Sequence, residues 1–308
     1  MSLTFREHGP DFAAEVGGVD LSRPLSEGDF AALQAGIDRC GVLVFRGQRL
    51  DDAAQLAFSL RFGPLETALK RDVYGPGAHP QVTRLSNLDD EGRRLPPDDE
   101  RVVYTLGNEA WHTDSSFKPV PAKYSLLSAR EVPPEGGDTE FADVRAAYDA
   151  WSGSDAGLRK EALEGLVCEH SIVYSRSVIT GDLFRPDEKA ALPPVRHLLV
   201  RTHPATGRRN FYVGSHCSHI VQWPLEQGRA LIRALDAWST QPRFVYAHRW
   251  RAGDLAMWDN RSVLHRGRPF DRTRFRRLMH RTTVAGDGPT VPGEAPGAAA
   301  ASAAGRPA

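Results

Sequence analysis

A histidine and a carboxylate stand two residues apart in the segment 111–114, which has the sequence Trp-His-Thr-Asp. An extended backbone would direct His112 and Asp114 to the same side of the chain. An imidazole and a carboxylate in this arrangement can both bind one metal ion. Two histidines and one carboxylate form the facial triad of non-haem Fe(II) oxygenases, which leaves three coordination positions open. The pair therefore predicts two of the three ligands of such a centre.

The third ligand has to come from a distant part of the chain. His265, within the segment 257–267, is the best candidate. The chain contains 11 histidines, and a His-x-Asp pair also occurs by chance, so these residues alone leave an ordinary structural role open. A zinc hydrolase with the same three ligands stays open as well, because zinc accepts histidine and carboxylate ligands.

Two arginines near the C-terminal end of the chain could supply binding groups for anions. The segment 276–284 has strand character, and in a strand Arg277 and Arg281 would face the same side. Buried guanidinium groups require anionic partners, and arginine forms bidentate pairs with carboxylates. Either two small anions bind here, one of them a cosubstrate, or both arginines form ordinary salt bridges within the fold.

The overall charge excludes proteins that bind polyanions through bulk electrostatics. The chain has 308 residues, with 39 basic and 39 acidic side chains and a net charge of zero. Residues 261–281 nevertheless contain eight arginines against one acid, Asp271. We therefore expect a small anionic organic substrate, and neither a nucleic-acid partner nor a membrane.

Cysteine usage and the N-terminal segment predict a cytoplasmic protein. Cys40, Cys168 and Cys217 are far apart and form no Cys-x-x-Cys pair, which is typical of buried thiols in a reducing compartment. The first residues lack the apolar region of a signal peptide, and no apolar run is long enough to span a bilayer. A homo-oligomer is left open.

The elements that would position these residues are short strands and helices separated by glycine and proline turns. The predicted strands span 42–45, 243–250, 254–258 and 278–284. The predicted helices are one capped by Ser26 and stopped at Gly41, one from 51 or 52 to about 63, and those at 143–151, 154–166 and 225–238. This pattern favours an antiparallel sandwich or jelly roll with helices outside. We expect one domain over 1–285 and a disordered Ala/Gly/Pro tail over 286–308.

Several motifs in a fixed order resemble the TauD/TfdA family of Fe(II)- and 2-oxoglutarate-dependent dioxygenases. Within that family the chain looks closest to the 2,4-dichlorophenoxyacetate (aryloxyalkanoate) dioxygenases. The resemblance covers most of residues 10–285 and is carried by 41–48, 61–66, 111–117, 133–141, 258–266 and the arginine strand, with 141–150 and 214–219 favouring the aryloxyalkanoate branch.

The resemblance implies a fold and a set of roles. The fold would be a double-stranded β-helix (jelly roll), mainly β, with flanking helices. His112, Asp114 and His265 would hold Fe(II), and Thr139 and Arg277 would bind the distal carboxylate of 2-oxoglutarate. The substrate would contact Arg281, Asn108 and Lys70, although the loop that contains Lys70 varies in length between family members.

The resemblance also implies the reaction. With O2, 2-oxoglutarate would be converted to succinate and CO2 while the substrate is hydroxylated. A hydroxylated aryloxyalkanoate such as 2,4-dichlorophenoxyacetate would collapse to a phenol and glyoxylate. The alternatives are a taurine, alkyl-sulfonate or sulfate-ester dioxygenase and a tailoring hydroxylase of an amino-acid-like acid. A different class is a non-catalytic jelly-roll sensor that binds a metal or an anion.

Overall fold

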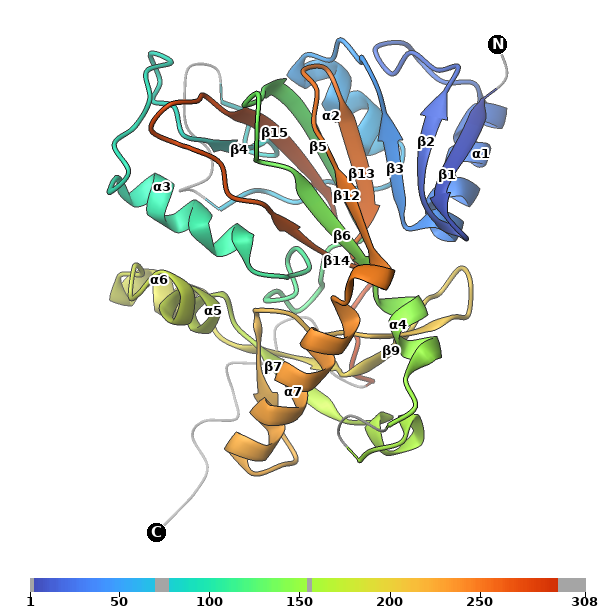
Figure 1. The fold of residues 1–308 in the computed structure, drawn as a ribbon, viewed down its shortest axis with the longest axis vertical. Coiled ribbons are helices and arrows are strands. Elements are labelled where there is room, and N and C mark those ends of the chain that lie inside the picture. The colour runs from blue at the N-terminus through green and yellow to red at the C-terminus, as the bar shows by residue number, and fades with distance from the viewer. Residues whose placement is uncertain (1–2, 70–77, 154–156, 293–308) are drawn as a thin grey trace.

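The computed structural model describes residues 3–69, 78–153 and 157–292. Its largest element is a twisted seven-stranded sheet that crosses the upper half of the molecule in Figure 1. The strands follow the order β1 (Thr4–Gly9), β2 (Phe12–Gly17), β3 (Val42–Phe45), β13 (Leu255–Asp259), β5 (Tyr124–Glu131), β15 (Leu278–Val284) and β4 (Thr83–Ser86).

A smaller three-stranded sheet faces the large one. It contains β12 (Val245–His248), β6 (Thr139–Asp143) and β14 (Val263–Gly267) in that order. Phe141 and Val263 of this sheet pack with Val44, Trp258 and Met279 of the large sheet in one buried cluster. Two sheets joined through a shared apolar interior form the predicted jelly roll, and the fold class is confirmed.

Helices α1 (Glu27–Cys40) and α2 (Asp52–Leu60) cover the outer face of the large sheet. Ser26 accepts a hydrogen bond from the backbone N–H of Asp29, and Gly41 ends α1 in a left-handed conformation with φ of 67°. These are an N-cap and a C-cap of the expected kinds. The first two predicted helices are therefore confirmed, although α2 ends three residues before residue 63.

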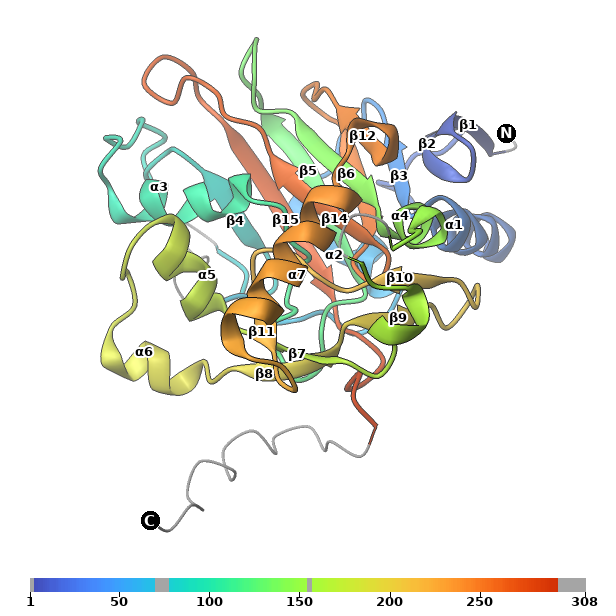
Figure 2. The same cartoon turned by 60° about the horizontal axis from the view of Figure 1, so that its bottom comes forward.

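Below the jelly roll, short strands and helices form a second layer. A three-stranded sheet orders β11 (Cys217–Ile220), β7 (Val167–His170) and β8 (Val195–Leu198), and β10 (Arg209–Phe211) pairs with β9 (Val200–Thr202). Figure 2 shows α7 (Leu225–Ser239) lying across this layer. The remaining α-helices are α3 (Glu100–Thr105), α4 (Val144–Ala150), α5 (Ile172–Ile179) and α6 (Pro186–Ala191).

The predicted helix over 154–166 is wrong. Within the described part of this segment, only the 3₁₀ turn Lys160–Leu163 is helical. Gly157 and Gly165 have φ of 67° and 76°, so a left-handed glycine interrupts the chain on each side of the turn. Leu163 is still fully buried, which explains the apolar spacing that suggested a helix.

The predicted strand over 243–250 is shorter than expected. Residues Pro242–Phe244 form a 3₁₀ turn, and β12 covers only Val245–His248. The side chains along this stretch still alternate, because Phe244, His248 and Trp250 are buried while Ala247 and Arg249 are exposed.

The first seven residues of the Ala/Gly/Pro tail, 286–292, belong to the described chain, and the Thr290 hydroxyl lies 2.8 Å from Nδ1 of His197. Residues 293–308 lie outside the described residues, so the disordered tail stays a prediction. The single domain over 1–285 also stays a prediction. None of the described helices is long and apolar enough to cross a membrane. The cytoplasmic location, the lack of a nucleic-acid partner and the oligomeric state stay predictions.

Two buried histidines in the lower layer give the fold a pH dependence. His170 of β7 and His197 of β8 have ring centroids 5.1 Å apart, and both side chains are fully buried. Burial, with the nearby His197 and Arg201, lowers the pKa of His170 well below its ordinary value. Burial also lowers the pKa of His197 to about 4. A histidine whose pKa is lowered by folding favours the folded state fully at a pH above the pKa that it has in the unfolded chain. This contribution to stability is lost as the pH falls below that value.

We therefore expect the free energy of unfolding to fall by about 1.3 kcal/mol for each of these histidines between about pH 7.5 and about pH 5.5. Urea unfolding of the wild type and of a His170→Phe variant measures this, and the variant should lose about that much less. Asp236, whose pKa burial raises to about 7, acts in the opposite direction in both proteins. An equal loss in the two proteins would contradict the assignment to His170.

Candidate active site

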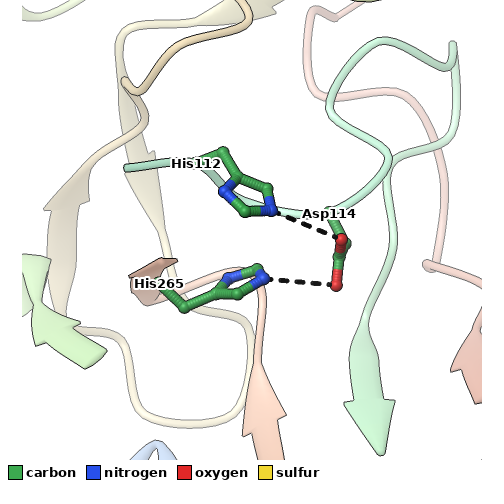
Figure 3. A group of neighbouring side chains, drawn as sticks. All are labelled: His112, Asp114 and His265. Carbon is green, nitrogen blue, oxygen red and sulfur yellow. Dashed lines mark ion pairs between the residues drawn. The ribbon is translucent and has the colours of Figure 1, made fainter. Parts of the chain in front are cut away.

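The three predicted metal ligands lie together at one end of the jelly roll. His112 and His265 face each other across an isolated backbone bridge, with N–H to C=O distances of 3.0 and 2.8 Å in the two directions. Asp114 Oδ1 lies 3.9 Å from His112 Nε2, and Asp114 Oδ2 lies 3.6 Å from His265 Nε2 (Figure 3). One ligand atom from each residue lies within 4.8 Å of the others. The structure therefore brings together residues that are 153 positions apart in the sequence.

The chemistry of the donor set fits a divalent iron ion. Nδ1 of His112 lies 2.8 Å from the carbonyl of Ala110, which leaves Nε2 as the atom that faces Asp114. Burial lowers the pKa of His112 to about 4, and burial together with His112 holds the pKa of His265 well below its ordinary value. Both imidazoles are therefore neutral at neutral pH. Two neutral imidazoles and one carboxylate on one side of a metal ion form the facial arrangement that Fe(II) oxygenases use.

Asp114 is ionised and held in one orientation. Burial alone raises the pKa of Asp114, but the charge of Arg281, the two histidines and a hydrogen bond from Ser125 hold this pKa well below its ordinary value. Ser125 Oγ donates to Oδ2 of Asp114 at 2.7 Å, and the Asn260 amide donates in turn to Ser125 Oγ at 2.9 Å. Hydrogen bonds of this kind orient metal ligands.

The sequence did not reveal the role of Ser125 and Asn260. Asn260 Oδ1 also accepts hydrogen bonds from the Trp258 indole and from the backbone N–H of Asp114, at 3.0 and 3.1 Å. The run Trp258–Arg261 was noted only as a family motif. The signal that the sequence offered was a polar residue, Asn260, shortly after the predicted strand 254–258 and five positions before His265.

Two cavities meet at the triad. The first, here called the Arg277 cavity, is lined by Thr139, Arg277, Trp258, Phe270 and both histidines, among others. The second, here called the Arg176 cavity, is lined by Asp114, Tyr104, Arg176, His216 and Lys118, among others. Asn108, His112 and Arg281 line both. The arrangement provides two adjoining compartments at the candidate metal centre.

The Arg277 cavity contains a guanidinium group, that of Arg277, which forms no salt bridge with any carboxylate in the described part of the chain. Burial, with the charge of Arg272, lowers the pKa of Arg277 to about 10, so this side chain is still cationic at neutral pH. Its Nε has no hydrogen-bond partner among the described residues. Thr139 Oγ1 accepts a hydrogen bond from the Trp250 indole at 2.9 Å, which leaves the hydroxyl proton of Thr139 available. A carboxylate would satisfy both groups.

Arg281 of β15 and Arg277, which directly precedes this strand, both line the Arg277 cavity, so the two arginines do face the same space. Arg281 Nη1 lies 2.5 Å from Oδ1 of Asp114. Arg281 therefore forms a salt bridge within the fold, and its partner is a candidate metal ligand. His280 points to the other side and contacts Asp52 of α2 at 2.6 Å. Asn108 lies between the cavities, and Lys70 lies outside the described residues, so its role stays a prediction.

A second group of acids and histidine lies away from the cavities. Asp38, His203 and Asp259 bring ligand atoms within 4.8 Å of one another. Arg261 Nη2 is 2.7 Å from Asp259 and 3.3 Å from Asp38. A guanidinium already supplies the positive charge at this point, so the group is a structural ion-pair network.

Comparison with known proteins agrees with this geometry. The model of the "Taurine catabolism dioxygenase TauD, TfdA family" matches residues 4–283. The chain belongs to this family of dioxygenases. The TauD/TfdA match spans both sheets of the jelly roll and all three residues of the triad.

Named relatives within the TauD/TfdA family share up to about two fifths of the sequence. The "Alpha-ketoglutarate-dependent 2,4-dichlorophenoxyacetate dioxygenase" of Cupriavidus pinatubonensis is 42% identical over 92% of this chain and 98% of its own length. The "(S)-phenoxypropionate/alpha-ketoglutarate-dioxygenase" of Sphingobium herbicidovorans is 36% identical over 90% of this chain and 92% of its own. A solved structure, AAD-2 with Mn(II) and N-oxalylglycine, superposes with a TM-score of 0.86 at 43% identity, covering 94% of this chain and 99% of that one.

Proposed function

We propose that this protein is an Fe(II)- and 2-oxoglutarate-dependent dioxygenase that hydroxylates an aryloxyalkanoate such as 2,4-dichlorophenoxyacetate. The main support is a buried His/His/Asp group with cationic side chains in both of the cavities that adjoin it. The relatives named for 2,4-dichlorophenoxyacetate and phenoxypropionate support the substrate class.

The proposed roles follow the two cavities. His112, Asp114 and His265 would hold Fe(II). Bound iron would supply the activation of O2 and the oxidative decarboxylation of 2-oxoglutarate to succinate and CO2. In the Arg277 cavity, Arg277 and the Thr139 hydroxyl would bind the distal carboxylate of 2-oxoglutarate, since both have donors available there.

The substrate would lie in the Arg176 cavity. Arg281 lines both cavities, and a nitrogen of its guanidinium that Asp114 does not use would donate to the anionic group of the substrate. Asn108 would contact the substrate from the same wall. Held in this way, the carbon next to the ether oxygen would face the metal. Hydroxylation of that carbon gives a hemiacetal, which collapses to a phenol and glyoxylate.

The test is a substrate panel. The protein is loaded anaerobically with Fe(II) and 2-oxoglutarate, a visible charge-transfer band is recorded, and succinate release is measured after O2 is added. Phenoxyacetates should be converted and taurine-type sulfonates should not. Conversion of sulfonates alone would replace the substrate class with the sulfonate alternative. No band and no succinate with any anion would overturn the oxygenase and favour a zinc hydrolase or a sensor.

A further inference from the structure

The cavity named after Arg176 contains this residue as a buried cation, and nothing in the sequence drew attention to it. It lies on α5, its side chain is 4% exposed, and it lines the cavity together with Asn108, His112 and Arg281. An arginine is rarely buried to this extent unless it is paired. Its environment therefore needs an explanation.

The contacts of Arg176 fix its guanidinium but leave donors unused. Nη2 donates to Oδ1 of Asn108 at 2.9 Å, and the guanidinium carbon lies 4.8 Å from the centre of the Tyr104 ring. Nε and Nη1 are buried and have no hydrogen-bond partner in 3–69, 78–153 and 157–292. A Cβ at Gly107 would lie 2.0 Å from Nη1, so the glycine leaves the space that the guanidinium occupies.

The other cations of this cavity that belong to the described residues already have carboxylate partners. Lys118 Nζ lies 2.6 Å from Glu66, and Arg281 Nη1 lies 2.5 Å from Asp114. No carboxylate of the described chain forms a salt bridge with Arg176; its one polar partner there is the neutral amide of Asn108. A buried charge without a counter-charge is strongly unfavourable. Among the described residues, Arg176 is therefore the guanidinium of this cavity that a monoanionic ligand would pair with.

We propose that Arg176 is a specificity-determining residue that receives the anionic group of the substrate, which is thereby shared between Arg176 and Arg281. This inference rests on the proposed function and names a second recognition residue for the same substrate. Because Arg281 already neutralises Asp114, Arg176 supplies the net charge that selects a carboxylate. Arg176 also engages Oδ1 of Asn108, which directs the amide donors of Asn108 away from the guanidinium.

The test compares Michaelis constants in Arg176→Gln with those of the wild type. We expect the KM for phenoxyacetate to rise on the order of 10- to 100-fold, as for the loss of a charge-assisted hydrogen bond. The KM for 2-oxoglutarate should stay within about twofold, because Arg176 does not line the Arg277 cavity. Arg176→Lys, which restores the charge, should recover part of the lost affinity.

Arg229→Gln is the matched control. Arg229 lies on α7 with its guanidinium 5.5 Å from the ring of Tyr174, next to α5 but outside both cavities. Its loss should leave both Michaelis constants unchanged. An unchanged KM for phenoxyacetate in Arg176→Gln, or an equal rise in the KM for 2-oxoglutarate, would overturn the inference.

If Arg176→Gln does not fold, a second variant, Gly107→Ala, tests the same inference. Gly107→Ala places a methyl group where Nη1 lies and displaces the guanidinium without removing it. The same selective rise in the KM for phenoxyacetate supports the inference, and its absence overturns it. A wild type that converts no phenoxyacetate contradicts the proposed function instead, and the variants are then compared with the anion that does release succinate.

Discussion

Replacing Asp114 with alanine is expected to reduce succinate release at least about 1,000-fold, because the only carboxylate of the proposed metal centre is lost. Asp114 lies between two neutral imidazoles and is ionised, so it supplies the negative charge that a divalent ion needs. The measurements are the iron content after anaerobic loading and the rate of succinate formation with 2-oxoglutarate and phenoxyacetate.

Asp114→Asn separates loss of the ligand from loss of the fold. The amide keeps the size of the side chain and an oxygen that can accept the hydrogen bond of Ser125, but it has no charge. We expect the same loss of iron and of activity, with an unchanged far-UV circular dichroism spectrum. Asp287→Ala, which removes an exposed carboxylate that lies 3.7 Å from Lys123, is the control. Activity of Asp114→Ala within about tenfold of the wild type would refute the assignment of this ligand.

Arg277→Gln should raise the KM for 2-oxoglutarate about 100-fold, since charge-assisted hydrogen bonds from the guanidinium to the proposed carboxylate are lost. The same variant should be at least as stable as the wild type when no 2-oxoglutarate is present. Arg277 is partly buried and its buried Nε has no partner among the described residues, so its removal takes away an uncompensated charge. Steady-state kinetics and thermal unfolding with and without 2-oxoglutarate measure the two effects.

The neighbouring arginine provides the control. Arg276 points away from the cavity and forms a two-point salt bridge with Glu131, at 2.7 and 2.9 Å. Arg276→Gln should leave the KM for 2-oxoglutarate unchanged. A normal KM in Arg277→Gln, or an equal increase in both variants, is incompatible with the role proposed for Arg277.

Local signals predicted most of the elements. The caps at Ser26 and Gly41 and the strand 278–284 were found because a few neighbouring residues determine them. The prediction of a helix over 154–166 was wrong because two left-handed glycines interrupt a segment whose apolar spacing resembles that of a helix. The pairing order of the large sheet, in which β3 lies next to β13, depends on contacts between distant segments and cannot be read from local patterns.

In the candidate site, too, some residues could be recognised from local sequence, whereas others became apparent only in three dimensions. His112, Asp114, Arg277 and Arg281 could be singled out because residue type and spacing suggest their chemistry. His265 was the best candidate for a distant third ligand, and Thr139 came from the family resemblance. Arg176 had no such signal, since a single arginine on a short helix is ordinary until its burial is known. The turn after Asp114, where Ser115 has φ of 55°, is likewise unfavourable locally and visible only in three dimensions.

The backbone bridge between His112 and His265 has a consequence for biosynthesis. The two histidines are positioned by main-chain hydrogen bonds between the middle of the chain and β14, a strand near its C-terminal end. A nascent chain that has not yet emerged from the ribosome as far as β14 lacks His265, the third proposed ligand, however well its first strands have paired. Contacts of such long sequence separation also carry a large loop-closure cost and slow folding. We therefore expect the candidate iron centre to form only after β14 has been synthesised, so that shorter translation products do not bind iron there.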